Sequence, residues 1–457
     1  MHSFRDQIST VSEKGKRVWI YPKKQKGRYY TARTLLSILL LAFLFGSPFI
    51  KISGHPFMLF NIFERHFIIF GLSFSPQDFY LFVLLTISGL IFIVLFTAVF
   101  GRLFCGWVCP QTVFMEMVYR RIENWIEGDS AQQRALENSP VTGKKFFKKS
   151  AKHIIFAAIA FLIGNTLMAY LIGIDKVFNI ISKPPSENLS GFIAVFVFSG
   201  IFYFVFSYFR EQACVIVCPY GRLQGVLLDP SSLVVAYDHV RGEPRGKLSK
   251  EETTNGDCID CHLCVAVCPT GIDIRNGTQL ECVNCTSCID ACDSIMDKVE
   301  KQKGLIRYAS AKGIIEKTKF KLNKRAYAYT ALLAVLLTVF VILFNLRTEL
   351  DVNVLRAPGK VYQEQPDNKV SNLYSIKFVN NTFEKIPVII KVDNPDAELK
   401  LVGSGINVEP QSVFESEFLI VFSKEKLSKA LVPLNIQVFA SDKPVREIKT
   451  SFLAPYK

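Results

Sequence analysis

Cysteine is missing from both ends of this 457-residue chain, since none precedes Cys105 and none follows Cys292. The C-terminal segment therefore cannot be a small secreted domain held together by disulfides. That segment, after Leu346, also has no histidine, and we find no catalytic constellation in it. We expect it to bind or dock a partner.

The sequence contains five long apolar runs, and lysine and arginine are scarce in two of the segments that separate them. The runs predict membrane-spanning helices at 79–100, 154–174, 191–209 and 326–346, with a shorter one at 35–50. No A-x-A-like cleavage site follows the first run, which predicts a retained anchor.

The distribution of lysine and arginine predicts the orientation of these spans. Nine precede the first run and nine lie between residues 102 and 152, whereas segments 51–78 and 175–190 hold two each. The positive-inside rule then places the N-terminus and the 102–152 and 210–325 regions in the cytoplasm, and the tail after Leu346 outside. Because the net charge of +14 clusters beside the spans, we expect no nucleic-acid partner.

The twelve cysteines fall into four groups with none left over. They are Cys105 and Cys109; Cys214 and Cys218; Cys258, Cys261, Cys264 and Cys268; and Cys282, Cys285, Cys288 and Cys292. The first two groups are C-x3-C-P motifs. The last two are C-x2-C-x2-C-x3-C runs, which are typical of bacterial ferredoxins. Cytoplasmic thiols in this pattern indicate metal or redox chemistry.

The two ferredoxin-like runs predict two [4Fe–4S] clusters. In two-cluster ferredoxins each cluster takes three thiolates from one run and the fourth from the other. One cluster would therefore bind Cys258, Cys261, Cys264 and Cys292, and the other Cys282, Cys285, Cys288 and Cys268. Zinc is an alternative, because four-cysteine zinc sites also use C-x2-C pairs. The string CIDCH also matches the attachment motif of c-type haem. Such haem is attached outside the cytoplasmic membrane, whereas the charge distribution places this string inside, so we interpret the match as a coincidence.

The two C-x3-C-P motifs are copies of each other. Their cysteines and prolines are all 109 residues apart, and each motif follows a phenylalanine-rich run, which indicates two repeated hairpins. If each preceding helix continues, the spacing places both sulfurs of a pair on one face. Two facing pairs would form a four-thiolate site for Cu(I), zinc or an iron–sulfur cluster. A redox-active dithiol or simple helix packing are the alternatives.

Two further segments have a distinct pattern. The apolar stretch 56–74, interrupted by Glu64, Arg65 and His66, predicts an interfacial or re-entrant helix. The tail instead alternates, with strands predicted at 374–379, 387–392, 418–423 and 434–440 and a turn at Asn380-Asn381-Thr382. This pattern predicts an immunoglobulin-like β-sandwich.

These features predict a polytopic α-helical membrane protein with two attached domains. The predicted parts are a basic cytoplasmic N-terminus (1–33), a four-helix membrane domain with the two hairpin repeats (34–229), a cytoplasmic ferredoxin-like domain (230–325), a fifth transmembrane helix (326–346) and a periplasmic immunoglobulin-like domain (347–457).

The chain closely resembles one family over nearly its whole length, and four stretches carry the resemblance. They are residues 104–123 (FCGWVCPQTVFMEMVYRRIE), 214–246, 256–298 and 304–310. The family is that of the cytochrome c oxidase accessory protein CcoG, also called FixG or RdxA. The resemblance implies an inner-membrane polyferredoxin that reduces Cu(II) to Cu(I) for assembly of cbb3-type oxidase. Its copper-binding, catalytic cysteines would be Cys105, Cys109, Cys214 and Cys218.

The same resemblance implies oxidase assembly factors and copper-transport proteins as partners, with an unidentified electron donor. Two other functions stay open. One is a quinol-linked electron carrier without a copper role, in which the C-x3-C-P motifs only shape a quinone pocket or a docking edge. The other is a non-enzymatic assembly or copper-docking factor whose β-domain binds oxidase subunits or a chaperone.

Overall fold

The computed structural model of the chain describes most of its residues. These are residues 9–12, 14–52, 54–62, 66–74, 78–247, 255–318, 322–357, 361–401, 405–427, 429–440 and 443–455. The chain forms two compact units, one of residues 1–59 and 84–338 and the other of residues 60–83 and 339–457.

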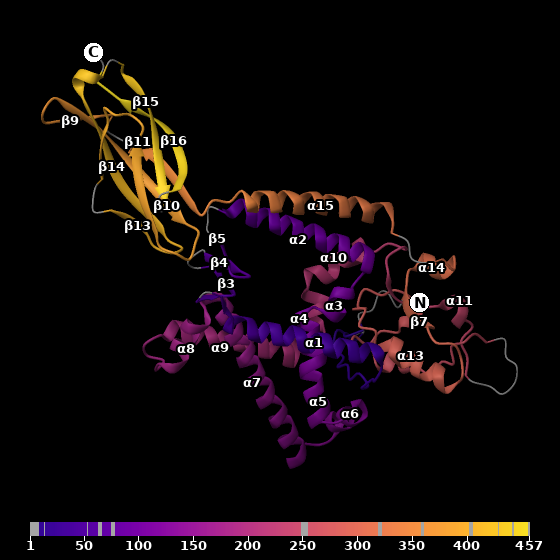
Figure 1. Ribbon diagram of the computed structural model, residues 1–457. Coiled ribbons are helices and arrows are strands. Elements are labelled where there is room, and N and C mark those ends of the chain that lie inside the picture. Colours follow the sequence, from indigo (N-terminus) through magenta and orange to yellow (C-terminus); the bar gives the residue numbers. More distant parts are fainter. Residues whose placement is uncertain are drawn as a thin grey trace. The chain divides into compact units, whose positions relative to one another are not determined.

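Five helices in the described part of the chain are long and apolar enough to cross a membrane, as predicted. They are α1 (Arg28–Gly46) with the short η1 (Ser47–Phe49), α2 (Phe79–Phe100), α7 (Gly143–Ile172), α9 (Leu189–Phe204) with the π-helical η4 (Val205–Phe209), and α15 (Lys324–Asn345) (Figure 1). Large apolar side chains such as Leu35, Leu90, Phe196 and Val335 are exposed on them. Such surfaces suit contact with lipid.

Helices α7 and α9 pack closely. A Cβ atom added to Gly164 of α7 would lie 2.6 Å from Oγ of Ser199 in α9, and small residues allow such approach between membrane helices. The π-helix η3 (Val113–Tyr119) joins this bundle through a buried aromatic core. In that core Tyr119 stacks on Phe206 at 4.7 Å between ring centroids. This packing anchors the chain that follows the first C-x3-C-P motif.

The remaining helices of the first unit are short. They are α3 (Leu103–Trp107), α4 (Pro110–Thr112), α5 (Arg120–Ile126), α6 (Ser130–Asn138), α8 (Ile174–Ser182), the π-helix η5 (Ala213–Val217), α10 (Pro219–Leu227), α11 (His239–Gly242), α12 (Leu263–Ala266), the 3-10 helix η6 (Ile274–Asn276), α13 (Ser287–Lys298) and α14 (Ala311–Ile315).

A two-stranded sheet closes the segment that carries the two cysteine runs. Strand β6 (Val234–Tyr237) pairs antiparallel with β7 (Ile306–Ala309), which follows the second run. Beneath the sheet lies a core of apolar side chains that includes Val235, Ile289 and Leu305 together with several of the cysteines. The two runs are thus held between the ends of one short β-ladder.

The predicted interfacial helix within residues 56–74 is wrong, because the segment forms strands. Short strands β1 (Lys51–Ile52) and β2 (His55–Pro56) pair with each other, and β3 (Met58–Asn61), β4 (His66–Ile69) and β5 (Leu72–Phe74) form a three-stranded sheet. Burial along β3 alternates residue by residue, which is the strand period and not the helical one. Phe70 and Gly71 have positive φ and make the turn between β4 and β5. Glu64 and Arg65 lie outside the described residues.

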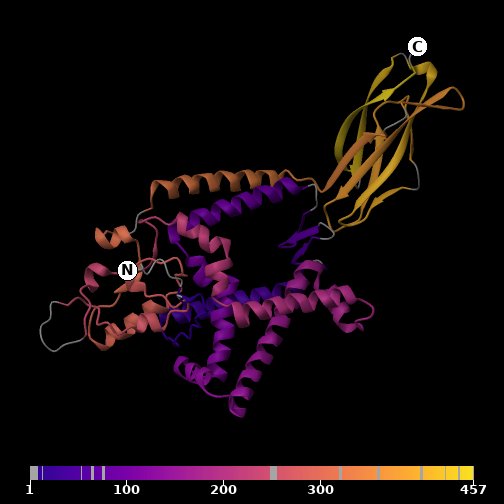
Figure 2. The same ribbon diagram turned by 180° about the vertical axis from the view of Figure 1, so that it is seen from behind.

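The C-terminal segment is the predicted β-sandwich. Its strands are β8 (Leu350–Arg356), β9 (Gln363–Gln365), β10 (Lys369–Asn380), β11 (Ile386–Val392), β12 (Glu398–Leu401), β13 (Ile406–Val408), β14 (Val413–Ser423), β15 (Leu431–Ala440) and β16 (Lys443–Leu453). One sheet has the order β12-β14-β10-β8, with β9 beside β10, and the other has the order β13-β11-β15-β16. Figure 2 shows the sandwich from behind, in orange and yellow. All four strands predicted from the alternation are present.

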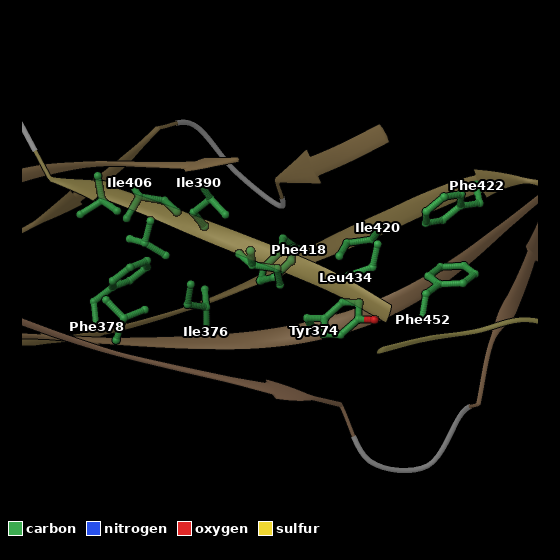
Figure 3. Close-up of a cluster of buried hydrophobic side chains, with 14 of the residues drawn as sticks. Tyr374, Ile376, Phe378, Ile390, Ile406, Phe418, Ile420, Phe422, Leu434 and Phe452 are labelled. Atoms are coloured by element: carbon green, nitrogen blue, oxygen red, sulfur yellow. The ribbon is translucent and has the colours of Figure 1, made fainter. Parts of the chain in front are cut away.

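Aromatic and branched side chains fill the space between the two sheets. Tyr374, Phe378, Phe418 and Phe452 are fully buried there, and the rings of Tyr374 and Phe418 stack at 5.4 Å (Figure 3). The Tyr374 hydroxyl donates to the carbonyl of Ser451, 2.9 Å away on the facing sheet. The sandwich core is therefore apolar, with a polar link between its layers.

The turn predicted at Asn380 is present, and it is held by the asparagine side chain. Nδ2 of this fully buried residue donates to the carbonyls of Glu384, Val408 and Glu409. Its Oδ1 accepts from the backbone N–H of Thr382 at 2.9 Å.

Replacing Asn380 by alanine should destabilise the sandwich by roughly 1–3 kcal/mol, because buried carbonyls would lose their donor. Hydrogen exchange in the full-length protein measures this as faster exchange of the β10 and β13 amides. Asn407→Ala, on an exposed position of β13, is the matched control. Equal protection in the two variants would contradict the prediction.

Candidate functional site

Eight cysteines line two neighbouring cavities in the first unit. One cavity, with about 370 Å³ of empty space, is lined by Cys258, Cys261, Cys264 and Cys292. The other, with about 340 Å³, is lined by Cys268, Cys282, Cys285 and Cys288, and also by Cys264. The structure thus gathers the cysteines into the two sets expected from their spacing, including the fourth cysteine that each set takes from the other run.

The two runs share one backbone conformation. Asp260 and His262 in the first run, and Asn284 and Thr286 at the equivalent positions of the second, all have φ between 52° and 67°. Left-handed backbone is uncommon outside glycine and is typical of functional sites. It curls each loop, so that α12 or α13 begins directly after the second left-handed residue. The third cysteine of each run then lies in the first turn of that helix.

Burial disfavours the charged form of several of these thiols. It raises the pKa of Cys264, Cys282 and Cys292 to about 12. Thiols in this state bind metal by releasing their protons, so that the positive charge of the metal replaces the missing solvation. The cavities therefore fit a cationic group held by sulfur.

The breadth of the cavities distinguishes between clusters and single ions. Among the described residues, no three His, Cys, Asp or Glu side chains converge closely enough to hold one metal ion. The cysteines instead line mainly apolar spaces, in which Cys258, Cys264 and Cys285 are buried and Cys261 is exposed. This arrangement suits a multi-atom iron–sulfur cluster better than a tetrahedral zinc site.

The C-x3-C-P motifs do not continue the preceding helices, so the expectation that each pair lies on one helical face is wrong. Cys109 is the N-cap of α4 and Cys218 the N-cap of α10, with ψ of 124° and 111°. Proline follows each of them, and a residue before proline disfavours the α conformation. Each motif is therefore a helix break, and the two copies break at the same cysteine.

The four cysteines of these motifs nevertheless lie near one another. Burial is the main cause that raises the pKa of Cys214 to about 12, and the nearby thiols of Cys109, Cys105 and Cys218 add to it. Burial likewise raises the pKa of Cys105 to about 11. Nε2 of Gln224, on α10, donates to the Cys105 sulfur at 3.3 Å. The first motif thus meets the helix that follows the second, and together they form what we call the four-thiol site.

The four-thiol site lies directly against the loop of the second cavity. A Cβ atom added to Gly106 would lie 2.5 Å from the carbonyl oxygen of Val283. The buried Arg33, on α1, donates to the carbonyls of Gly106 (3.1 Å) and Cys285 (2.9 Å). Arg102 donates to the carbonyls of Leu280 and Gly221. Backbone of the first motif therefore touches backbone between Cys282 and Cys285.

A buried ion network flanks the cysteines on the side of α5. Arg120 pairs with Glu211 at 3.2 Å and also donates to the carbonyl of Pro269, the residue after Cys268. Glu123 pairs with Arg210. Burial alone would raise the pKa of Glu123, but Arg210, Lys152 and Arg120 hold it below its usual range.

Sequence reasoning missed these positioning residues. Arg33 and Gln224 lie far along the chain from the cysteines that they contact, so no spacing signals them. Arg102 is three residues before Cys105, but an arginine at the end of an apolar run reads equally well as a topology signal.

Family comparisons agree with this arrangement. Residues 82–128 match a 4Fe-4S binding domain, residues 209–311 a 4Fe-4S dicluster domain and residues 340–455 the immunoglobulin-like fold at the C-terminus of FixG. The nitrogen fixation protein FixG of Rhizobium meliloti is 30% identical over 91% of this chain and 88% of its own length. The chain belongs to the FixG/RdxA family.

Other proteins of related name are also similar. RdxA of Cereibacter sphaeroides is 32% identical to this FixG/RdxA-family chain over 82% of each protein. A crystal structure of a FixG-related protein from Vibrio parahaemolyticus covers 24% of the chain and 100% of its own, with 19% identity and a TM-score of 0.22. The resemblance noted from the sequence is confirmed. The chain is a membrane-associated 4Fe–4S electron-transfer protein of the FixG/RdxA family.

Gly106→Ala should loosen the contact between the four-thiol site and the second cavity, because the added methyl group cannot fit beside the Val283 carbonyl. We expect anaerobically purified protein to lose up to about half of its iron, as one of two clusters is weakened. Iron analysis and the visible absorbance check this. Gly200→Ala, where an added Cβ meets nothing within 4 Å, should keep full iron content. Equal iron content in both variants would count against the contact.

Proposed function

We propose that this protein is a membrane-bound cupric reductase, which reduces Cu(II) to Cu(I) to supply copper for the assembly of cbb3-type cytochrome c oxidase. The observation that carries the proposal is the direct backbone contact between the four-thiol site and the Cys282–Cys285 loop. This contact places the four thiols, which are soft metal ligands, next to a loop that would hold an iron–sulfur cluster. Soft thiolates favour Cu(I), so the four-thiol site would stabilise the product of the reduction.

In this proposal eight cysteines hold two [4Fe–4S] clusters. Cys258, Cys261, Cys264 and Cys292 would hold one, and Cys268, Cys282, Cys285 and Cys288 the other. Bound clusters supply one-electron transfer. The chain contributes cavities in which seven of these eight cysteines are buried or half-buried, and left-handed loops that position the sulfurs.

Copper is the substrate, and Cys105, Cys109, Cys214 and Cys218 would bind it. Because no three thiols of the described residues converge on one point, binding by the four-thiol site would draw these sulfurs together around the ion. Each Cu(II) gains one electron to become Cu(I). The thiols that bind it release protons, because burial raises the pKa of Cys105 and Cys214 above the ordinary value. Gln224 orients the Cys105 sulfur through its hydrogen bond.

The proposal also includes an orientation and partners. The Lys and Arg distribution supports a cytoplasmic side for residues 1–33, 102–152 and 230–325, with residues 347–457 in the periplasm of a bacterium. Copper-transport proteins and oxidase assembly factors would be the partners, and the β-sandwich is the domain that we expect to dock them.

A second candidate is an electron carrier without a copper role, in which the four-thiol site binds another iron–sulfur cluster. It is favoured by the 4Fe-4S binding domain match over residues 82–128, which contains Cys105 and Cys109 but neither ferredoxin-like run. Metal analysis separates the two candidates.

The double variant Cys105→Ser/Cys109→Ser should bind no copper at the four-thiol site and lose Cu(II) reduction, because serine is a poor ligand for Cu(I). Its iron content should equal that of the parent protein. Copper and iron are measured by elemental analysis, and Cu(I) formation with a Cu(I)-selective chelator under anaerobic conditions. Cys258→Ser is the control that should lose iron but still bind copper. A loss of iron without any change in copper binding in the double variant would favour the second candidate.

The last cysteine of each run, Cys268 or Cys292, is assigned to the cluster of the other run, and this assignment can be tested separately. Cys268→Ser should alter the same paramagnetic signal as Cys285→Ser, because both residues line one cavity. Cys292→Ser should alter the other signal, together with Cys261→Ser. Electron paramagnetic resonance of the reduced proteins measures this. Pairing of Cys268 with Cys261 instead would refute the assignment.

A further inference from the structure

A large cavity lies beside the ion network, away from the cysteines. It spans about 1370 Å³, part of which is open solvent. Six of its lining residues carry the argument: Trp19, Tyr21, Glu123, His153, Tyr203 and Tyr208. They come from the N-terminal segment, α5, the early turns of α7 and the last turns of α9 and η4. All of them belong to the first compact unit.

The position of the cavity gives access from lipid. It lies where α9 and η4 end and where α7 passes from its basic first turns, with Lys145 and Lys149, into its apolar part. Beside it Phe204, Tyr208 and Ile154 expose half or more of their surface. Aromatic side chains concentrate at such membrane boundaries. A ligand with an apolar tail could therefore keep the tail in lipid and place its head group in the cavity.

The walls combine aromatic rings with groups that exchange protons or hydrogen bonds. Trp19 and Tyr208 contact each other edge to face, with centroids 6.0 Å apart. Nδ1 of His153 and the hydroxyl of Tyr203 are 2.9 Å apart, so Nε2 is the second imidazole nitrogen that a ligand hydroxyl can use. The Glu123 carboxylate, whose side chain is 5% exposed, lines the cavity beside Lys152 at 3.5 Å. Flat rings with a base and a carboxylate suit a flat aromatic head group that bears hydroxyls.

One layer of side chains separates this cavity from the cysteines. Arg210 lines the cavity and pairs with Glu123. Its backbone carbonyl accepts from Nε2 of Gln111 at 3.2 Å, two residues after Cys109. A second buried pair, Arg120 with Glu211, reaches the carbonyl of Pro269, next to Cys268, and the charge of Arg120 acts on Glu123. The cavity is therefore joined by hydrogen bonds to the first C-x3-C-P motif and electrostatically to the pair that contacts the first ferredoxin-like run.

We propose that this cavity binds a membrane quinol, and that quinol oxidation here supplies the electrons. The inference rests on the proposed reductase function, whose electron donor it specifies. Oxidation of one quinol to the quinone breaks two O–H bonds and releases two electrons and two protons. The two [4Fe–4S] clusters that the eight cysteines would hold could take one electron each. His153 takes a proton at an imidazole nitrogen, and the water-accessible side of the cavity takes the second.

Binding is measured on the full-length protein in detergent or nanodiscs, by quenching of tryptophan fluorescence with decylubiquinone and menadione as probes. Saturable quenching is expected, and Trp19→Phe should remove most of it because Trp19 lines the cavity. His153→Ala and the milder Tyr203→Phe should each weaken binding, the histidine change by at least about tenfold, equivalent to about 1.4 kcal/mol.

The matched control is a second cavity of similar size, about 1440 Å³, lined by Tyr30, Arg121 and Trp125 but by no histidine. Trp125→Phe should leave the saturable quenching and the affinity unchanged. Unaltered affinity in both His153→Ala and Tyr203→Phe would overturn the proposal. So would binding of phosphatidylglycerol vesicles that depends on His153 when neither quinone binds.

A second measurement distinguishes this proposal from the cupric reductase function. Protein is first reduced with dithionite, and the excess dithionite is removed before Cu(II) is added. His153→Ala prepared in this way should reduce Cu(II) as fast as the parent protein, whereas decylubiquinol should reduce the clusters of the variant more slowly. Equal cluster reduction by decylubiquinol in the variant would contradict the quinol site alone. Failure of the pre-reduced parent protein to reduce Cu(II) would contradict the reductase function, and the binding result would stand by itself.

Discussion

The site depends on the contact between Gly106 and the carbonyl groups of the Cys282–Cys285 loop. Arg33 holds this contact from a membrane helix, with its guanidinium bonded to carbonyls on both sides. A buried arginine that bonds only to carbonyls is costly unless its donors are well matched. Here the rigid fork of the guanidinium spans two loops at once. Because the carbonyls come from different segments, the position of one cysteine group fixes that of the other.

Burial of the thiols keeps them neutral in the metal-free protein, yet it strengthens their binding of a metal. Thiols with a raised pKa are neutral when no metal is present, so the cavities do not hold several uncompensated negative charges. Metal binding reverses this, since positive charge and sulfur replace water at the same place. The same low polarity that keeps the empty thiols inert strengthens their hold on a cationic group. A solvated set of cysteines would not combine these properties.

Much of the architecture could be predicted from local patterns. Apolar length gave the five spans, alternation gave the sandwich strands, and spacing alone paired Cys268 and Cys292 with the opposite runs. The failures have local causes as well. Pro110 and Pro219 disfavour helical backbone at the preceding Cys109 and Cys218, so that a new helix begins at each proline. The apolar composition of 56–74 hides the period of two in β3.

Other features had no pattern to reveal them. The large cavity takes Trp19, Glu123, His153 and Tyr203 from four separate segments, and no spacing connects these residues. Arg33 and Gln224 meet their cysteine partners only through the packing of α1 and α10. The sequence therefore predicted site residues that are close together along the chain. It did not predict site residues that come into contact only when distant segments pack.

The N-terminus of α1 is completed by a residue from a distant part of the chain. Backbone N–H groups of Tyr29 and Tyr30 donate to the carboxylate of Asp290, on the helix that carries Cys288 and Cys292, across 261 and 260 residues of sequence. Free amides at a helix start favour such an anion. During synthesis α1 emerges first, and its cap is made only when the second cysteine run has emerged and α13 has formed. The N-terminal cap of the first membrane helix therefore depends on a residue that is synthesised some 260 positions later.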